Sequence, residues 1–168
     1  MTTRTGAMAL YKRQDYRAAR LIVAGAALVL LTFGIAEAHV SISPRESLAG
    51  ATEKYVIRAP TEGKVSTTSV ELEVPDGVIV ETVAVPVGWT YEVKRKDDRI
   101  VAITWQMTIK PGEFAEFGFV ARNPREKTDI VWTLRQRFAD GTVTDFTKTA
   151  AGAIRPTAVT KLAPMKTQ

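Results

Sequence analysis

From residue 40 onward the sequence consists of short runs of alternating apolar and polar residues, broken by turn residues about every 8–12 positions. The run Val70-Glu71-Leu72-Glu73-Val74 has the period of two expected for a strand with one buried face. Pro75-Asp76-Gly77 follows it as a turn, because proline fixes φ and glycine accepts positive φ. Asp140-Gly141 is a strong hairpin signal. Because no helical periodicity occurs in this part of the chain, we predict an all-β protein of about nine short strands, an antiparallel β-sandwich.

Residues 1–38 have a different character. The first twenty residues hold five Lys/Arg and one acid, and Leu21-Ile35 is free of charge. Ala36-Glu37-Ala38 then has the small-x-small pattern of a cleavage site, so we predict a secretory signal peptide over residues 1–38, removed after Ala38. The protein would then be periplasmic or secreted, with no membrane anchor after cleavage. The alternative is an uncleaved N-terminal membrane anchor, although the apolar run is shorter than the ~20 residues that span a bilayer.

The composition limits the classes of function. A hydrophobic fraction of 45% suits a single domain, which we place at residues 39–150. The formal charge of +5 falls to about +2 once residues 1–38 leave, since they carry five bases and two acids. The sequence has no basic stripe interleaved with aromatic residues, which argues against nucleic-acid binding. The absence of cysteine excludes disulfides and thiolate metal sites.

The remaining segments are expected to be structural or disordered. Residues 151–168 are rich in small, charged and proline residues, and we expect this tail to be largely disordered. The large aromatic residues are expected in the core: Trp89, Trp105, Trp132, Phe117 and Phe119. The sequence has no nucleophile elbow and no phosphate-binding glycine loop, so we do not expect an enzyme.

His39 is the only histidine in the chain and directly follows the predicted cleavage site. Cleavage would make it the N-terminal residue, with a free α-amine beside its imidazole. An α-amine has a pKa near 8, so a metal can displace its proton at neutral pH. The amine and Nδ1 can then chelate one metal, and tetragonal nitrogen ligands favour Cu(II). The alternative is that His39 is merely the first residue of a strand.

A family resemblance adds to this interpretation. From His39 to about Phe146 the chain resembles the YcnI-like domain family of exported copper-binding proteins. The residues that carry the resemblance occur in order along the chain: His39-Val40-Ser41-Ile42, Pro44, Glu46, Gly50, Tyr55 to Glu62, Thr67-Thr68, Val74 to Val78, Gly88-Trp89, Pro111 to Phe114, Phe119 to Pro124, and Asp140-Gly141. The resemblance implies an immunoglobulin-like or fibronectin-like sandwich that binds one Cu(II) per chain. In that site the N-terminal amine and imidazole are joined by a carboxylate, with a tryptophan nearby.

Transferred to this chain, the resemblance implies that His39 provides the two nitrogens and Glu46 the carboxylate, with Glu113 as the second candidate. A straight strand from His39 to Glu46 would span roughly 23 Å, so Glu46 reaches the metal only if the chain reverses near Pro44. The alternative is that Glu46 is a solvated loop acid. The family tryptophan falls at Phe146, which is not a ligand but could cover the metal, and the neighbouring Asp145 is a weaker oxygen candidate.

Three functions follow as alternatives. The first is copper trafficking or homeostasis, as a metallochaperone or a sequestering protein, with a copper-transport membrane protein or another copper chaperone as partner. The second is a metal-free interaction module in which Phe146 marks a degenerate site. The third, a copper enzyme with a histidine brace, is the weakest, because such enzymes use a second histidine that this chain lacks.

Overall fold

The computed structural model describes residues 40–148 and 151–165. The predicted signal peptide and His39 lie outside the described residues. Within the described ranges the regular structure is β-strand apart from one 3-10 turn, η1 (Pro156–Ala158), so the predicted all-β class is confirmed. No helix in these ranges is long and apolar enough to cross a membrane.

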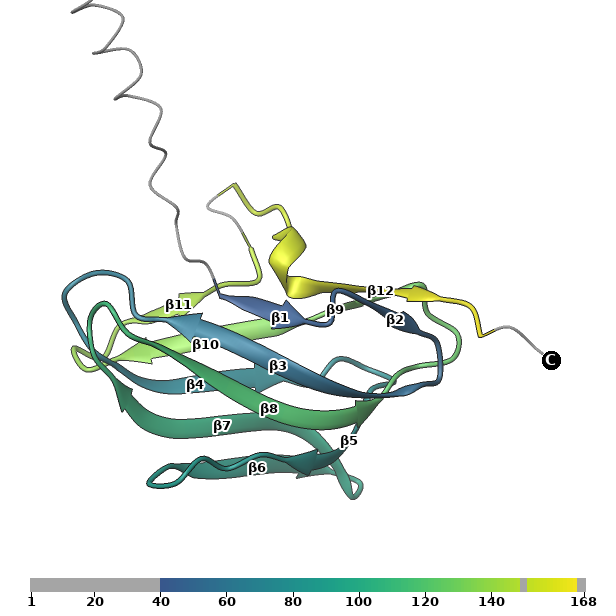
Figure 1. Ribbon diagram of the computed structural model, residues 1–168, viewed down its shortest axis with the longest axis horizontal. Coiled ribbons are helices and arrows are strands. Elements are labelled where there is room, and N and C mark those ends of the chain that lie inside the picture. The colour runs from purple at the N-terminus through teal and green to yellow at the C-terminus, as the bar shows by residue number, and fades with distance from the viewer. Residues whose placement is uncertain (1–39, 149–150, 166–168) are drawn as a thin grey trace, which may run out of the picture. The chain divides into compact units, whose positions relative to one another are not determined.

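Two antiparallel sheets form the sandwich (Figure 1). The first sheet has the order β1-β3-β8-β5, and the second has the order β11-β10-β4-β7-β6. The strands of the first sheet are β1 (Ser41–Ser43), β3 (Thr52–Pro60), β8 (Phe114–Arg122) and β5 (Ile79–Val83). Those of the second are β11 (Val143–Asp145), β10 (Thr133–Phe138), β4 (Thr67–Glu73), β7 (Arg99–Ile109) and β6 (Thr90–Lys96).

The core lies between these two sheets and follows the sequence alternation. On β4, Val70 and Leu72 are buried, whereas Glu71 and Glu73 face outward and bind Arg135 at 2.7 and 3.1 Å. Four of the five aromatic residues predicted for the core are buried, and Trp89 is partly buried against the core. Ring contacts join Trp105 to Phe117 at 5.3 Å and Phe119 to Trp132 at 5.6 Å between centroids.

A third, smaller sheet contains residues of the C-terminal segment that was expected to be largely disordered. β12 (Val159–Ala163) lies between β2 (Glu46–Leu48), with which it runs parallel, and β9 (Asp129–Val131), with which it is antiparallel. Thr160 and Leu162 are buried, and Trp132 Nε1 donates a hydrogen bond of 3.1 Å to Thr160 Oγ1. The expectation of disorder therefore fails for these residues, and the folded domain continues past residue 150. The inward-facing pair Thr160 and Leu162 is too short a pattern to stand out among the surrounding prolines and lysines.

The pairing of the layers places two edge strands on the same side of the sandwich. Gln136 of β10 donates a hydrogen bond of 3.0 Å to the carbonyl oxygen of Pro60 at the end of β3, so β10 lies against β3. On the other side, β7 contacts β5 and β8. Because β1 neighbours β3 and β11 neighbours β10, the edge strands β1 and β11 close the same side of the sandwich.

Candidate metal centre

The described chain begins at the amino end of β1, and the pairing of this strand fixes the surroundings of Val40. Ser41 pairs with Arg58 in antiparallel register, so Val40 lies beside Ala59, one residue before the end of β3. Val40 is 2% exposed and Ile42 is fully buried, so these two side chains face the core. Val40 therefore lies near the carboxyl end of β3.

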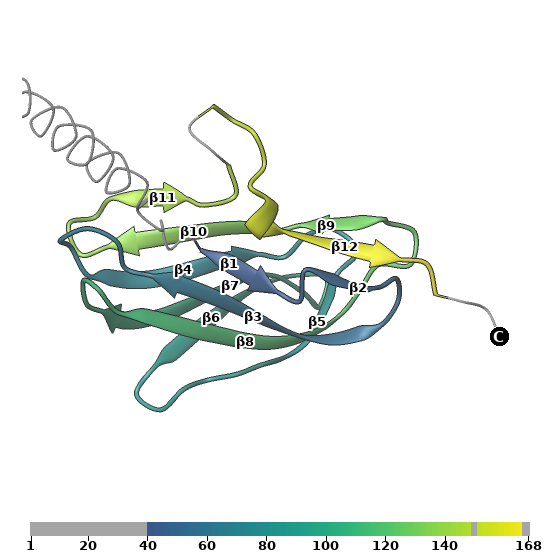
Figure 2. The ribbon, with the colours of Figure 1, turned by 45° about the horizontal axis from the view of Figure 1, so that its top comes forward.

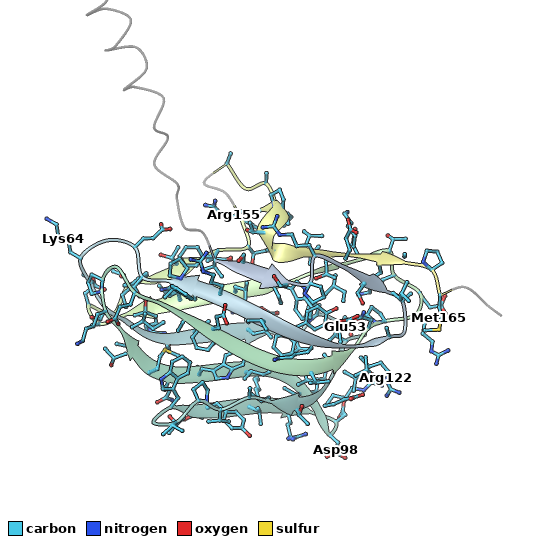
Figure 3. The ribbon with its side chains drawn as sticks, viewed as in Figure 1. Glu53, Lys64, Asp98, Arg122, Arg155 and Met165 are labelled. Atoms are coloured by element: carbon cyan, nitrogen blue, oxygen red, sulfur yellow. The ribbon has the colours of Figure 1, made fainter. Side chains whose placement is uncertain are left out.

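The amino end of β8 lies at the same end of the sandwich. Pro60 pairs with Phe114, and the Thr61 N–H donates a hydrogen bond of 2.9 Å to the Glu113 carbonyl oxygen. In Figure 3, Lys64 of the β3–β4 loop marks this end, and Arg122 at the carboxyl end of β8 lies at the opposite end with Met165. We call the end with Val40, Pro60 and Glu113 the β1-start end.

A depression opens at the β1-start end, between the β3–β4 loop and the β7–β8 turn. Two carboxylates line it, Glu62 and Glu113, together with Pro60, Phe114 and Arg58. The guanidinium of Arg58 lies over the ring of Phe114, 4.5 Å from its centroid. The depression thus combines exposed acids with a fixed cation on an aromatic ring.

Glu113 is one of the two carboxylates predicted from the sequence, and it lies at the β1-start end. Its carboxylate accepts a hydrogen bond of 3.0 Å from the Lys110 N–H, which closes the turn before β8. Because β3 lies between β1 and β8, about two strand spacings, or roughly 10 Å, separate Glu113 from the line of β1. Glu113 is near enough to be a candidate, but its carboxylate is already held by the turn.

Glu62 was not singled out from the sequence. It is exposed and follows the buried Thr61, directly after β3. Because β3 is the strand paired with β1, Glu62 lies two residues after the strand that neighbours the start of β1. The antiparallel pairing of β1 with β3 could have identified Glu62, because it brings the residues after Pro60 toward the start of β1.

Glu46, the first-ranked carboxylate, lies elsewhere. The chain does not reverse near Pro44, since β1 and β2 run in the same direction in both ribbon views (Figures 1 and 2). Pro44 accepts a hydrogen bond of 2.9 Å from Thr160 Oγ1, and Glu46 pairs with Lys161 of β12. Glu46 therefore lies beyond the carboxyl end of β1, and the structure does not bring it to the β1-start end.

Phe146, at the position of the family tryptophan, follows the edge strand β11. Its N–H donates a hydrogen bond of 2.8 Å to the Leu134 carbonyl oxygen, and its side chain packs partly buried against the core. Thr144 pairs with Gln136, and Phe146 comes two residues after Thr144. Phe146 therefore lies on the side of the sandwich that β1 closes. Asp145 Oδ1 accepts the Thr147 N–H at 2.8 Å, which uses this acid in the local turn.

A chain of buried hydrogen bonds lies behind the β1-start end. Gln136, 1% exposed, donates from Nε2 to the Pro60 carbonyl oxygen and to Thr67 Oγ1. Thr67 Oγ1 lies 2.7 Å from Thr61 Oγ1, which donates to the Ile109 carbonyl oxygen at 3.2 Å. Gln136 Oε1 is also buried and finds no hydrogen-bond partner among the residues that the structure describes.

The described residues do not form a metal site alone. Between residues 40 and 165, leaving out 149–150, no group of three or more His, Cys, Asp and Glu residues could hold a metal ion. The carboxylates at the β1-start end would supply oxygen ligands to nitrogen donors that enter beside Val40. Nitrogen and oxygen donors in this combination suit Cu(II). The described residues at this end offer the oxygen donors of such a set and no nitrogen side chain of histidine.

Comparison with solved structures defines the class of fold. A structure of an uncharacterized protein from Nocardia farcinica, described as having an immunoglobulin-like fold, matches with a TM-score of 0.63 at 24% identity. The match covers 74% of this chain and 98% of that chain. The protein is thus an immunoglobulin-like β-sandwich, as the resemblance implied.

Comparison with family models and curated proteins defines the family. The model described as "Domain of unknown function (DUF1775)" matches residues 39–165, and the chain belongs to this family, the domain family of the YcnI-like proteins. The matched region begins at His39 and includes β12. "Copper-binding protein CutI" of Bacillus subtilis (strain 168) is 36% identical over 115 residues, covering 67% of this chain and 56% of CutI. The match thus spans little more than half the length of that relative.

Proposed function

We propose that the mature protein begins at His39 and is an exported, non-enzymatic copper-binding protein. The α-amine and imidazole of His39, together with a carboxylate, would bind one Cu(II). The observation that carries the proposal is that the β1-start end, where Val40 enters the fold, also bears Glu62 and Glu113. The copper-binding relative and the start of the family match at His39 support it.

Glu62 is the favoured carboxylate in this proposal. It follows β3, the direct neighbour of β1, whereas Glu113 precedes β8, which β3 separates from β1, and the Glu113 carboxylate is held by the Lys110 N–H. Glu46 sits beyond the opposite end of β1, beside Lys161. Glu113 is the second candidate, and a copper ligand role for Glu46 would require a rearrangement of β1 and β2.

The biological role that suits such a site is copper trafficking or homeostasis outside the cytoplasm. The carboxylates are exposed at one end of the sandwich, so a bound ion would be accessible to a second protein. A metallochaperone that passes copper to a transport membrane protein or another copper chaperone needs this accessibility. A sequestering protein would use the same ligands with slower release.

One observation favours a second candidate, a metal-free interaction module. Phe146 stands where the resemblance places a tryptophan, and a phenyl ring lacks the indole N–H and its greater electron density. If the aromatic residue is essential for the site, the sandwich would have kept its fold and lost copper. The two candidates differ in whether the free terminus binds copper.

A pair of proteins that differ by one residue tests the proposal. One begins at His39, and the other has alanine in place of this residue (His39→Ala), which keeps the α-amine but removes the imidazole that completes the chelate. Titration with Cu(II) should give a one-to-one endpoint with the first protein and much weaker binding with the second. Equal binding by both proteins, or binding by neither, would contradict the proposal and favour the metal-free module.

A further inference from the structure

Strand β6 leaves a long, open edge on the second sheet. It ends the strand order of that sheet, and within the described part of the chain it pairs with β7 alone (Figure 1). Of the four edge strands of the two large sheets, β6 is the longest, with seven residues against five in β5 and three each in β1 and β11. All residues of β6 except the partly buried Val93 are exposed. The outward backbone groups of β6 are therefore available to a further strand.

The pairing of β6 with β7 defines which side chains share a face. Tyr91 and Val93 lie opposite buried residues of β7, so they are on the core side of the sheet. Glu92 and Lys94 alternate with them and are on the outer side. Neither Glu92 nor Lys94 has an ion-pair partner within residues 40–148 and 151–165. Both charges on the outer face of β6 are thus available for pairing across the open edge.

The backbone of β6 carries no bulge. Its register with β7 shifts between Lys94 and Arg95, because these neighbours pair with Ala102 and Ile100. The extra residue is therefore Val101 of β7, and β6 itself alternates without a break. A bulge in an edge strand is one device that prevents pairing with a second chain, and β6 lacks it.

The sequence of β6 is complementary to itself in one antiparallel register. A two-fold axis through Val93, perpendicular to the sheet, brings each side chain opposite one on the same face of a second copy. Glu92 then lies opposite Lys94, and Tyr91 lies opposite Arg95, each pair occurring twice. Opposite charges at directly facing positions stabilise a pair of strands, and a guanidinium can stack on an aromatic ring.

The other symmetric pairings bring like charges together. Because the two facing side chains must share a face, the neighbouring registers of β6 are centred on Glu92 or on Lys94, and each places that residue opposite its own copy. The middle residue of β5 is Glu81, so symmetric pairing along the whole of β5 also places two acids opposite each other. The register centred on Val93 is therefore the one that charge favours.

We propose that two copies of this chain associate through their β6 edges, in antiparallel register about Val93, to form a two-fold symmetric dimer. The contact joins the five-stranded sheets of the two copies into one continuous sheet. It also covers Tyr91, which is 41% exposed in the single chain. Because β6 is at the edge of its sheet opposite to β11, the dimer leaves the side closed by β1 and β11 open. The inference therefore does not depend on the proposed function.

Charge reversal on β6 tests the proposal. Each protein is expressed from the full 168-residue chain, and its mass is measured by sedimentation over a concentration series, with a chelator present to exclude bridging by metals. We expect the wild type to form dimers. Glu92→Lys and Lys94→Glu should each weaken dimerisation at least about tenfold, because each replaces two attractive pairs by two repulsive ones. The two substitutions together should restore the dimer, because opposite charges again face each other.

Lys54→Glu is the matched control, an exposed reversal on β3 in the interior of the first sheet, and should dimerise like the wild type. A monomeric wild type would overturn the proposal. It would also be overturned if the single reversals dimerised as well as the wild type, or if the double variant dimerised no better than the single ones.

A distance between two spin labels tests the register without changing either charge. The chain has no cysteine, so Thr90→Cys provides a single attachment point on β6. In the proposed register the two labelled positions are as far apart as positions 90 and 96 of one strand, about 20 Å. Electron paramagnetic resonance (EPR) distance measurement on the dimer should give a value close to this. A clearly different distance would show that the copies meet through another surface or register, and would overturn the proposal.

Discussion

Gln136 of β10 and Pro60 of β3 join the two sheets through a single hydrogen bond of 3.0 Å between the Gln136 Nε2 and the Pro60 carbonyl oxygen. The bond lies at the end of the sandwich where β1 begins and where Glu62 and Glu113 line a depression. The bond holds β10 against the end of β3 at this end of the fold. The chain of buried hydrogen bonds and the pairing of strands therefore both position the residues of the candidate site.

Removal of the middle hydroxyl of this chain should destabilise the protein. Thr67→Val keeps the shape of the side chain but leaves Gln136 Nε2 and Thr61 Oγ1 short of a partner. We expect a loss of about 1–3 kcal/mol in the free energy of unfolding, measured by denaturant titration. Thr68→Val, at a neighbouring position whose hydroxyl donates to the Arg137 carbonyl at an exposed site, is the control and should have a smaller effect. Equal losses for the two variants would show that the buried hydrogen bonds of Thr67 stabilise the protein no more than the exposed hydrogen bond of Thr68 does.

The C-terminal strand should contribute to stability. Leu162 of β12 is 5% exposed and packs with the core, so Leu162→Ala should cost about 2–5 kcal/mol of unfolding free energy. Lys161→Ala, on the exposed side of the same strand, should cost less than about 1 kcal/mol. If residues after 150 were disordered in solution, both substitutions would leave the denaturation midpoint unchanged.

The three candidate carboxylates should differ in their effect on copper affinity. Glu62→Gln removes the charge nearest the line of β1 and should weaken Cu(II) binding at least about tenfold, since it would remove a ligand. Glu113→Gln should have a smaller effect, and Glu46→Gln should have none, because Glu46 lies beside Lys161. Competition titrations of the three variants decide this order. A large loss with Glu46→Gln alone would restore the carboxylate predicted first from the sequence.

Stability should fall in alkaline solution because of Tyr55. Burial raises the pKa of Tyr55 from 10.0 to about 12, against the opposing hydrogen bond of 2.6 Å to Asn123 Oδ1. Between pH 10 and 12 the unfolded tyrosine loses its proton while the folded one keeps it, so the folded state binds more protons. Stability therefore decreases as the pH rises through this window, by about 2–3 kcal/mol in total.

The corresponding measurement compares unfolding free energies at pH 9 and pH 11.5 or above for Tyr55→Phe and Tyr91→Phe. Tyr91 is 41% exposed and serves as the control. The alkaline loss should shrink in Tyr55→Phe and persist in Tyr91→Phe. An unchanged alkaline loss in Tyr55→Phe would assign the effect to other groups.

Local patterns predicted the strands and turns well, because alternation and turn residues act over a few positions. Gly141, in the predicted Asp140-Gly141 turn, has φ 85° between β10 and β11. Asp140 closes this turn by accepting from Thr142, which lowers the pKa of its carboxyl. Trp105 and Trp132, predicted for the core as large aromatic residues, are buried.

Long-range pairing was less predictable. β2 and β12 have three and five residues, and each is stabilised by a partner that is distant in sequence, so neither produces a clear local pattern. Glu46 follows β1 and pairs with Lys161, and only the pairing of β1 with β3 indicates that Glu62, just after β3, lies toward the start of β1. For Gln136 a signal was available, since it occupies the inward position after Trp132 and Leu134 in an alternating run.

The central claim, that both nitrogens on Cu(II) come from the terminal histidine, has one direct test. His39 is the only histidine, so growth with 15N-labelled histidine labels its amine and imidazole alone. EPR and electron–nuclear double resonance spectra of the copper-loaded protein beginning at His39 should then show two directly bound nitrogens, both of them 15N. Nitrogen couplings that remain 14N, or a single 15N ligand, would show that copper is not held by the amine and imidazole of His39 and would contradict the account.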